Sequence, residues 1–283
     1  MVADHSAGTY EFRDPIRDFV RHGAAGVGPT SPRRHRLLRA LFDYYLRTAA
    51  AVDLQLEPRR VQLDLSRTPY PRVVPKLDSA QAALRWIRAE HENLLPLCRE
   101  MLDEDFAETC WQFCYYLRGY FYRTKRPASW VPIFRLGAEA AAKGGQRGPE
   151  GIMLNNVGLA LAQGGEPDQA ARYHLDAKAA FTAAGDRPGQ AIAEAHYGWA
   201  QYLQNNYDEA YRYTAKALGV LRVDGTPWHV ATTLESLALI AWKYDDKEKA
   251  TAYFREAHQV FLELDLPADA ARMTDQLHAL TAE

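Results

Sequence analysis

Small and bulky side chains recur along the second half of the chain at a fixed interval of 40 residues. Ala170, Ala210 and Ala250 share one register. Such an interval is the sequence signature of an architecture built from repeated structural units. Three further sets of positions repeat at the same interval: Ala177, Ala217 and Ala257; Tyr173, Tyr213 and Tyr253; and the bulky Phe181, Leu221 and Phe261.

Each copy of the repeat contains two segments that are separated by a short run of turn-forming residues. Glycine, asparagine and aspartate in these runs provide tight turns and helix N-caps, so each copy is predicted to be helix, turn, helix. Upstream of each turn a small residue recurs at Gly158, Gly198 and Ala238, where the two helices of a copy must approach closely. The turn-forming runs are 164–168, 205–208 and 244–247.

This alternation of small and large residues resembles the tetratricopeptide (TPR) consensus. The resemblance implies an all-α fold, a right-handed superhelical array of helix-turn-helix repeats with a concave groove. A degenerate copy precedes the others at an offset of 39, with Gly119, Phe134 and Ala138 matching Gly158, Tyr173 and Ala177. We therefore predict TPR-like repeats over 104–283, at about 104–146, 147–186, 187–226 and 227–266, with a C-terminal capping helix at 267–283.

The first hundred residues follow a different pattern. Apolar residues at helical spacing predict one long helix from Pro32 to about Leu56, followed by a proline-rich extended connector. A second helix is expected to begin at Asp78 or Ser79, with a kink or a break at Pro96. We predict a helical linker region over 29–103 and a short N-terminal segment over 1–28, in which 9–15 alternates like a short strand.

Four sequence segments resemble STAND-type bacterial regulators (signal-transduction ATPases with numerous domains). The segment 1–28 is similar to the end of the family's winged helix, although Arg13 stands where the family usually has histidine. No P-loop motif occurs, so the resemblance implies the helical sensor region without the ATPase core. The segments are YEFRDPIRDFVRHGAA, LLRALFDYYLRTAAAVD, AALRWIRAEHENLLPL and LNNVGLAL.

Charge and hydropathy exclude several classes of partner. The net charge is −2 and the sequence pI is near 6.5, which argues against the broad basic surface of a nucleic-acid-binding protein. No apolar run is long enough to cross a membrane, and the N-terminus has no secretory signal. We expect a cytoplasmic location and no contact with membranes, and a homodimer is compatible with the sequence.

The three cysteines are Cys98, Cys110 and Cys114. Cys110 and Cys114 lie four residues apart on one predicted helix face, a spacing that can hold a metal ion. Because no second pair of ligands lies nearby and free cysteine is commonly a small buried hydrophobe, we expect core packing. The sequence therefore predicts no metal and no cofactor.

Ligands of TPR stacks usually lie in the concave groove, which the first helix of each repeat lines. Counting from the glycine register places aromatic and polar residues there, a composition typical of a ligand site. The alternative is that these aromatic residues pack the helices against their neighbours. The predicted ligand-binding residues are Tyr116, Tyr120, Arg123, Asn155, Gln163, His196, Trp199, Tyr202, Glu235 and Trp242.

Two functions are consistent with this groove. The favoured one is a binding module, a sensor or scaffold that holds a peptide, a protein segment or a small metabolite. The other is an enzyme of a biosynthetic pathway in which His196 and Glu235 act as acid–base groups beside Arg123. A clamp for a C-terminal carboxylate is not expected, because Tyr116 and Glu235 stand where such clamps carry lysine.

Overall fold

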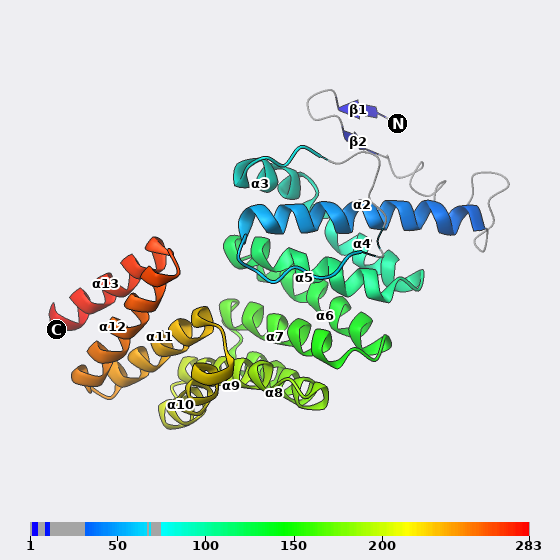
Figure 1. Cartoon of the computed structure of the whole chain (residues 1–283). Coiled ribbons are helices and arrows are strands. Elements are labelled where there is room, and N and C mark those ends of the chain that lie inside the picture. The colour runs from blue at the N-terminus through cyan, green and yellow to red at the C-terminus, as the bar shows by residue number, and fades with distance from the viewer. Residues whose placement is uncertain (1, 5–8, 12–31, 67, 69–74, 283) are drawn as a thin grey trace.

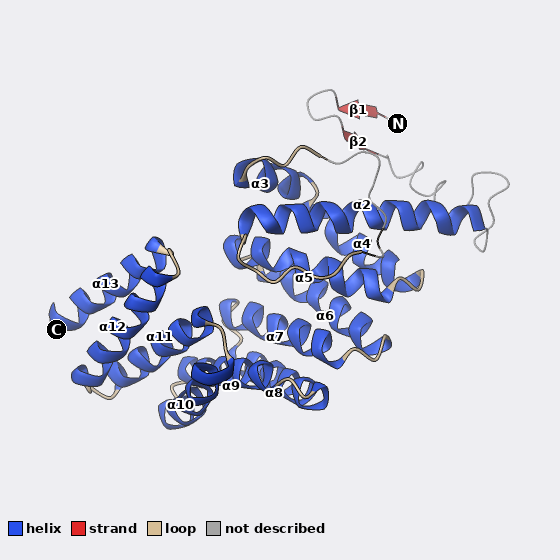
Figure 2. Ribbon diagram, viewed as in Figure 1, coloured by secondary structure: helices blue, strands red, loops and turns tan. Residues whose placement is uncertain are grey.

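The computed structural model describes residues 2–4, 9–11, 32–66, 68 and 75–282, and almost all of these lie in helices (Figure 1; Figure 2). The predicted all-α class is confirmed. Two three-residue strands, β1 (Val2–Asp4) and β2 (Thr9–Glu11), pair antiparallel. Most of the segment likened to a winged helix, including Arg13, lies outside the described residues. No described helix is both long and apolar enough to span a bilayer.

The N-terminal helices are one long helix and two shorter ones. The long helix, α2, occupies the range expected from the sequence. The helices are α2 (Pro32–Leu56), α3 (Ala80–Ala89) and α4 (His91–Asp103).

Four helix pairs and a final helix follow, in the order that the repeats predict. The pairs are α5 (Ala107–Thr124) with α6 (Pro127–Lys143), α7 (Arg147–Gln163) with α8 (Pro167–Ala184), α9 (Arg187–Leu203) with α10 (Tyr207–Asp224), and α11 (Pro227–Lys243) with α12 (Lys247–Glu263); α13 (Pro267–Ala282) follows them.

The recurring small residues are buried where the helices of a pair meet. A β-carbon at Gly158 would lie 2.5 Å from the His174 ring, and one at Gly198 would lie 3.0 Å from the carbonyl oxygen of Ala210. Only a residue without a side chain permits this approach of the backbones. The alanines of the two repeating registers have an exposed fraction of 0%, as predicted: Ala170, Ala177, Ala210, Ala217, Ala250 and Ala257.

Left-handed residues close the turns between consecutive helices. Gly165 and Gly185 have φ of 81° and 70°, and Asn205 and Asp245 reach 63° and 59° at equivalent turns. Glycine adopts this region without strain, and asparagine and aspartate tolerate it better than other residues do. The turns are therefore only a few residues long, which holds each pair of helices antiparallel.

The degenerate first repeat packs differently from its sequence alignment. Gly119 was aligned with Gly158, yet a β-carbon at Gly119 would meet Glu57 and Asp53, at the end of α2 and just beyond it, rather than a residue of α6. The close approach between α5 and α6 lies instead at Gly137, where a β-carbon would lie 3.0 Å from the β-carbon of Cys114. The prediction that Gly119 plays the packing role of Gly158 is therefore wrong, because α2 occupies the side of α5 that Gly119 faces.

The N-terminal helices pack against the first helix pair of the repeats. Helix α2 packs along α5, and α4 packs against both α5 and α6 (Figure 1). One hydrophobic core extends from Phe42 in α2 to Ala200 in α9. The boundary at residues 103 and 104 stays a prediction.

The predicted interruption at Pro96 was misplaced. Helix α3 ends at Ala89, and α4 then runs through Pro96 without a break. Pro96 is the sixth residue of α4, so only the hydrogen bond to the carbonyl of Glu92 is lost. The junction between the two helices is the single residue Glu90, with φ −89° and ψ 0°. No glycine or proline marks it in the sequence.

The buried glycines give a stability test with an internal control. We expect Gly198→Ala to lower the free energy of unfolding by about 1–3 kcal/mol through overpacking, although alanine has the better helix propensity. In contrast, Gly219→Ala in α10, where a β-carbon meets nothing within 4 Å, should stabilise by up to about 1 kcal/mol. Urea unfolding of both variants checks this; equal effects would contradict the close packing at Gly198.

Candidate ligand-binding face

The first helices of the repeats form a continuous inner layer. Helix α5 contacts α7, α7 contacts α9, and α9 contacts α11. At the ends of this layer, the Tyr122 ring on α5 meets the Trp228 ring on α11 edge to face, with centroids 6.5 Å apart. Arg59, beyond α2, also pairs with Asp265 in the turn before α13, at 3.4 Å. The two ends of the array therefore touch across its inner face.

A hydrogen-bonded network lies between α7, α8 and α9. Asn155 Oδ1 lies 2.7 Å from Nδ1 of His174, and Asn155 Nδ2 lies 2.9 Å from Nδ1 of His196. The amide oxygen accepts from His174 and also lies 3.1 Å from Nδ1 of His196, so the tautomer of His196 sets the direction of its hydrogen bond with Asn155. Asn155 and His174 are 6% and 1% exposed, so this predicted ligand residue is mainly committed to joining three helices.

The histidines of this region are held neutral. Burial, with the charges of His229 and Arg118, lowers the pKa of His196 to about 3. Burial, with Arg118 alone, lowers the pKa of His229 to about 4. Burial also lowers the pKa of His174. At neutral pH these rings therefore act as neutral donors and acceptors, and the positive charge of Arg118 acts on both His196 and His229.

The predicted residues of α5 do not line an open groove. Tyr116 and Tyr120 are each 1% exposed. The Tyr116 hydroxyl accepts from the backbone N–H of Leu63 at 3.0 Å, and the Tyr120 hydroxyl lies 3.1 Å from Nδ1 of His91. The expectation of accessible rings fails here because α2, the segment after it and α4 cover α5.

Arg123 likewise joins α5 to the N-terminal helices. Its guanidinium donates to the carbonyl oxygen of Leu56 at 2.6 Å and to Glu57 Oε1 at 3.1 Å. Both contacts fasten the end of α2 to the end of α5. Arg123 is therefore engaged in joining helices in this conformation.

Three other predicted residues lie apart from one another. Glu235 on α11 forms an ion pair with Arg272 of α13, and burial raises the pKa of its carboxyl. Trp242 packs edge to face against Phe254, with centroids 6.4 Å apart. Gln163 is exposed at the last position of α7. Their role in ligand binding stays a prediction.

The acid–base arrangement of the enzyme alternative gains no support from the described contacts. His196 contacts Asn155, Glu235 pairs with Arg272, and Arg123 pairs with Glu57. Among the contacts of the described residues, none joins His196, Glu235 and Arg123 to one another. A shared catalytic centre requires such proximity.

An aromatic ladder connects two repeats at the edge of the inner layer, and we define it as Trp199, Tyr202, Tyr207 and Tyr244. Trp199 and Tyr202 stack at 4.9 Å with an interplanar angle of 15°. The ring centroids of Tyr202 and Tyr207 lie 5.6 Å apart, and those of Tyr207 and Tyr244 lie 6.3 Å apart. Tyr244 is 48% exposed, so the ladder ends in solvent. The sequence identified its first two members.

Sequence reasoning missed four residues that face one another across the array: Arg118, Tyr122, Trp228 and His229. Arg118 and Tyr122 lie on a different face of α5 from the predicted Tyr116, Tyr120 and Arg123. The pairing of Trp228 with Tyr122 depends on the curvature of the whole stack. No local pattern in the sequence reports that curvature.

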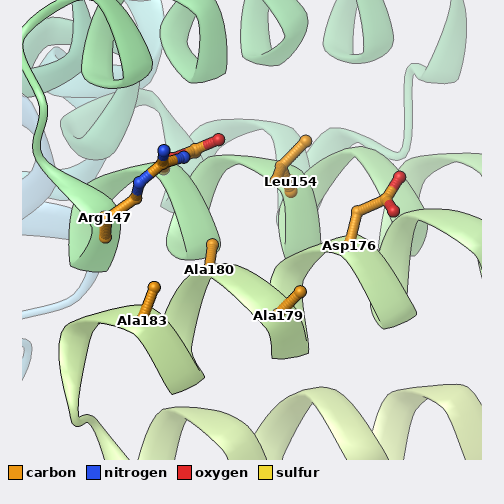
Figure 3. Close-up of a pocket in the computed structure, with 7 residues that line it drawn as sticks. Arg147, Leu154, Asp176, Ala179, Ala180 and Ala183 are labelled. Atoms are coloured by element: carbon orange, nitrogen blue, oxygen red, sulfur yellow. The ribbon is translucent and has the colours of Figure 1, made fainter.

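Two hollows among the described residues lie elsewhere. A cavity of about 390 Å³ lies between α7 and α8, as Figure 3 shows, and alanines make up much of its wall. Arg147, Glu150 and Asp176 are its charged groups. A second cavity, of about 280 Å³, includes Arg39, Asp43 and Gln112 in its lining. Neither contains a predicted ligand-binding residue.

Comparison of sequences identifies a regulatory relative. No protein-family model matches the chain. The regulatory protein AfsR of Streptomyces griseus is 25% identical over 244 residues, which cover 85% of this chain and 24% of AfsR. The chain thus spans about a quarter of the length of that relative. This similarity agrees with the resemblance to STAND-type regulators.

Comparison of structures supports the repeat fold. RapI in its apo form has a TM-score of 0.53 at 15% identity, covering 70% of this chain and 69% of RapI. A Rap protein complexed with competence and sporulation factor has a TM-score of 0.56 at 12% identity, covering 88% and 71%. BtubC of P. vanneervenii has a TM-score of 0.52 at 16% identity, covering 82% and 92%. At these identities the likeness shows the fold alone.

The neutral histidines predict a loss of stability in acid. Because the pKa values of His196 and His229 in the folded chain lie below the ordinary value of about 6.5, the unfolded chain binds more protons below that pH. The contribution of these two neutral histidines to the free energy of unfolding is complete above pH 6.5 and is lost as the pH falls toward 4. Urea midpoints measured from pH 7.5 to 4 should decrease accordingly.

A pair of histidine variants assigns this effect. His196→Gln should reduce the number of protons that the chain takes up on unfolding by up to about one. The urea midpoint should then depend less steeply on pH. His278→Gln, at an exposed position of α13, should leave the profile unchanged. If His278→Gln flattened the profile as much as His196→Gln, the buried network would not be its source.

Proposed function

We propose that this chain is the binding region of a regulator and that the aromatic ladder, with the adjoining inner face, holds a peptide or a segment of a partner protein. The observation that carries the proposal is the ladder itself. Four rings from two successive repeats form a row in which neighbouring ring centroids lie 4.9 to 6.3 Å apart. The last ring, that of Tyr244, is half exposed.

The extent of the ladder favours an extended ligand over a small metabolite. Packed helices lie about 8–10 Å apart, so rings on α9, α10 and the end of α11 spread over more than one helix spacing. An extended chain can place successive side chains on such a row. Tyrosine and tryptophan add contact area at small cost in side-chain entropy.

Polar groups are available beside these aromatic surfaces. His196 Nδ1 lies against the Asn155 amide, at 2.9 Å from Nδ2 and 3.1 Å from Oδ1, so Nε2 is the ring nitrogen with which His196 would meet a ligand. Glu235 and Arg272 form an ion pair on α11 and α13. A peptide backbone, which has both donors and acceptors, suits such a mixture.

The comparisons support a regulatory context for this binding. The relative AfsR is a regulatory protein, and one structure of similar fold is a Rap protein in complex with competence and sporulation factor. We propose that residues 104–283 bind the ligand and that 29–103 transmit the response. A ligand that bridges two repeats favours one curvature of the helix stack. That curvature determines the contact between Trp228 on α11 and Tyr122 on α5.

A display experiment tests the proposal. A library of random linear peptides should yield sequences that bind the purified chain and compete with one another. Trp199→Ala and Tyr202→Ala should each weaken their binding about tenfold or more, because truncation of a central aromatic residue costs about 2 kcal/mol. Affinities are measured by the change in intrinsic tryptophan fluorescence or, for Trp199→Ala, by calorimetry.

Leu262→Ala is the matched control, since Leu262 is 50% exposed on α12. It should leave the affinities unchanged. Enrichment of no peptide, or of peptides whose affinity Trp199→Ala and Tyr202→Ala leave intact, would reject the ladder as the binding surface.

A further inference from the structure

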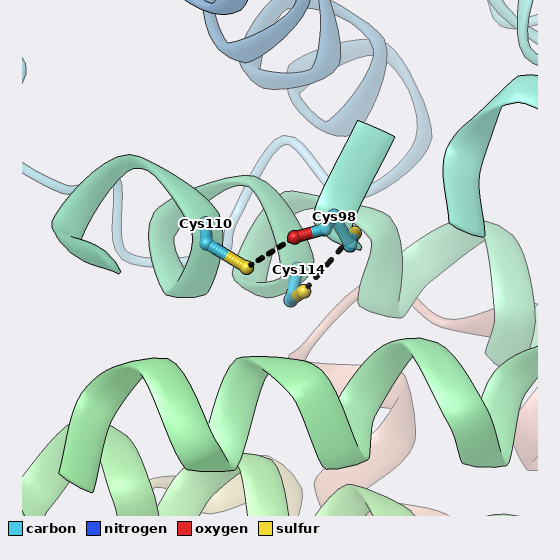
Figure 4. Close-up of side chains that lie close together, drawn as sticks. All are labelled: Cys98, Cys110 and Cys114. Carbon is cyan, nitrogen blue, oxygen red and sulfur yellow. Dashed lines mark hydrogen bonds between the residues drawn. The ribbon is translucent and has the colours of Figure 1, made fainter. Parts of the chain in front are cut away.

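All three cysteines of the chain converge at one point in the core. Cys98 comes from α4, and Cys110 and Cys114 come from α5 (Figure 4). Each side chain has an exposed fraction of 0%. The three Sγ atoms lie within 4.8 Å of one another, and those of Cys98 and Cys114 are 3.7 Å apart. No pair is joined in a disulfide.

Helix geometry and one turn produce this convergence. Residues four apart share a face of a helix, which brings Cys110 and Cys114 together. The short turn after α4, with Asp105 in the left-handed region at φ 66°, folds α4 back along α5 and adds Cys98. The sequence showed only the first of these relations.

The spacing of the sulfurs fits a common metal ion. With metal–thiolate bonds of about 2.3 Å, sulfurs around one ion lie about 3.8–4.0 Å apart in tetrahedral or trigonal geometry. The 3.7 Å between the Sγ atoms of Cys98 and Cys114 is close to this value. All three Sγ atoms lie within 4.8 Å of one another, so small side-chain rotations bring them to the spacing around an ion.

The surroundings offer sulfur and hydrocarbon to a ligand. A β-carbon at Gly137 would lie 3.1 Å from Cys114 Sγ and 2.9 Å from Met153 Sδ, so a thioether approaches from α7. No described His, Asp or Glu offers a ligand atom within the 4.8 Å group. Thiolate and thioether donors suit soft ions such as Cu(I). A structural zinc site would need a fourth protein ligand, and the group formed by the described residues has three.

We propose that Cys98, Cys110 and Cys114 form a buried three-sulfur site for a soft monovalent metal ion, with Cu(I) as its occupant. Binding forms metal–sulfur bonds and releases thiol protons to solvent, with no change of oxidation state. The ion joins α4 to α5 and so fastens the N-terminal helices to the first repeat. This site is independent of the proposed peptide surface, which lies on α9, α10 and the end of α11.

Copper titration of the whole chain tests the site. The reduced protein is titrated anaerobically with Cu(I) in the presence of a chromophoric Cu(I) chelator, both when folded and during refolding from urea. We expect one Cu(I) per chain, a rise in the thermal midpoint, and X-ray absorption with sulfur neighbours at about 2.3 Å. Cys98→Ala should weaken binding tenfold or more.

Two further variants keep the result interpretable. Met101→Leu, on the same helix and equally buried, should bind Cu(I) as the parent does. Cys110→Ala repeats the loss if Cys98→Ala fails to fold by circular dichroism. The absence of stoichiometric Cu(I) under both conditions, stronger binding of Zn(II) than of Cu(I), or unchanged affinity in both cysteine variants would overturn the proposal.

Discussion

The close approach of paired helices at residues without a bulky side chain is the constraint on which this architecture depends. At Gly158 and Gly198 the space for a β-carbon is already occupied by the partner helix, and the repeating alanines are fully buried. Close-packed interiors leave little freedom at such contacts. Each pair is therefore rigid, and the angle between pairs is passed from repeat to repeat.

Rigidity of the pairs explains how distant segments come to face one another. Tyr122 and Trp228 are far apart in the chain, yet their rings meet because the array curves over the two helix pairs that separate them, α7–α8 and α9–α10. Buried charges reinforce the stack: Glu194 on α9 pairs with Lys178 on α8 at 2.7 Å and with Lys216 on α10 at 2.8 Å. A carboxylate held between two ammonium groups joins neighbouring pairs, and these contacts lower its pKa although burial opposes them.

Much of the fold could be predicted from the sequence, whereas the candidate site was predicted only in part. The repeat interval located α7 to α12, because each repeat obeys the same local packing rule. For the inner face, Trp199 and Tyr202 were identified and prove to stack at 4.9 Å, whereas Tyr116 and Tyr120 are covered by N-terminal structure. The count of helix positions could not show that α2 packs along α5.

The sequence alone determined the helical class, the interval of the repeat and the residues that must be small, since these properties follow from interactions between near neighbours in the chain. The tertiary structure decided which aromatic rings reach solvent, which polar groups meet in the Asn155–His174–His196 network, and that Cys98 joins Cys110 and Cys114. These juxtapositions depend on the angles at which successive helix pairs pack. Such angles sum many weak contacts along the whole stack, and no single stretch of residues encodes them.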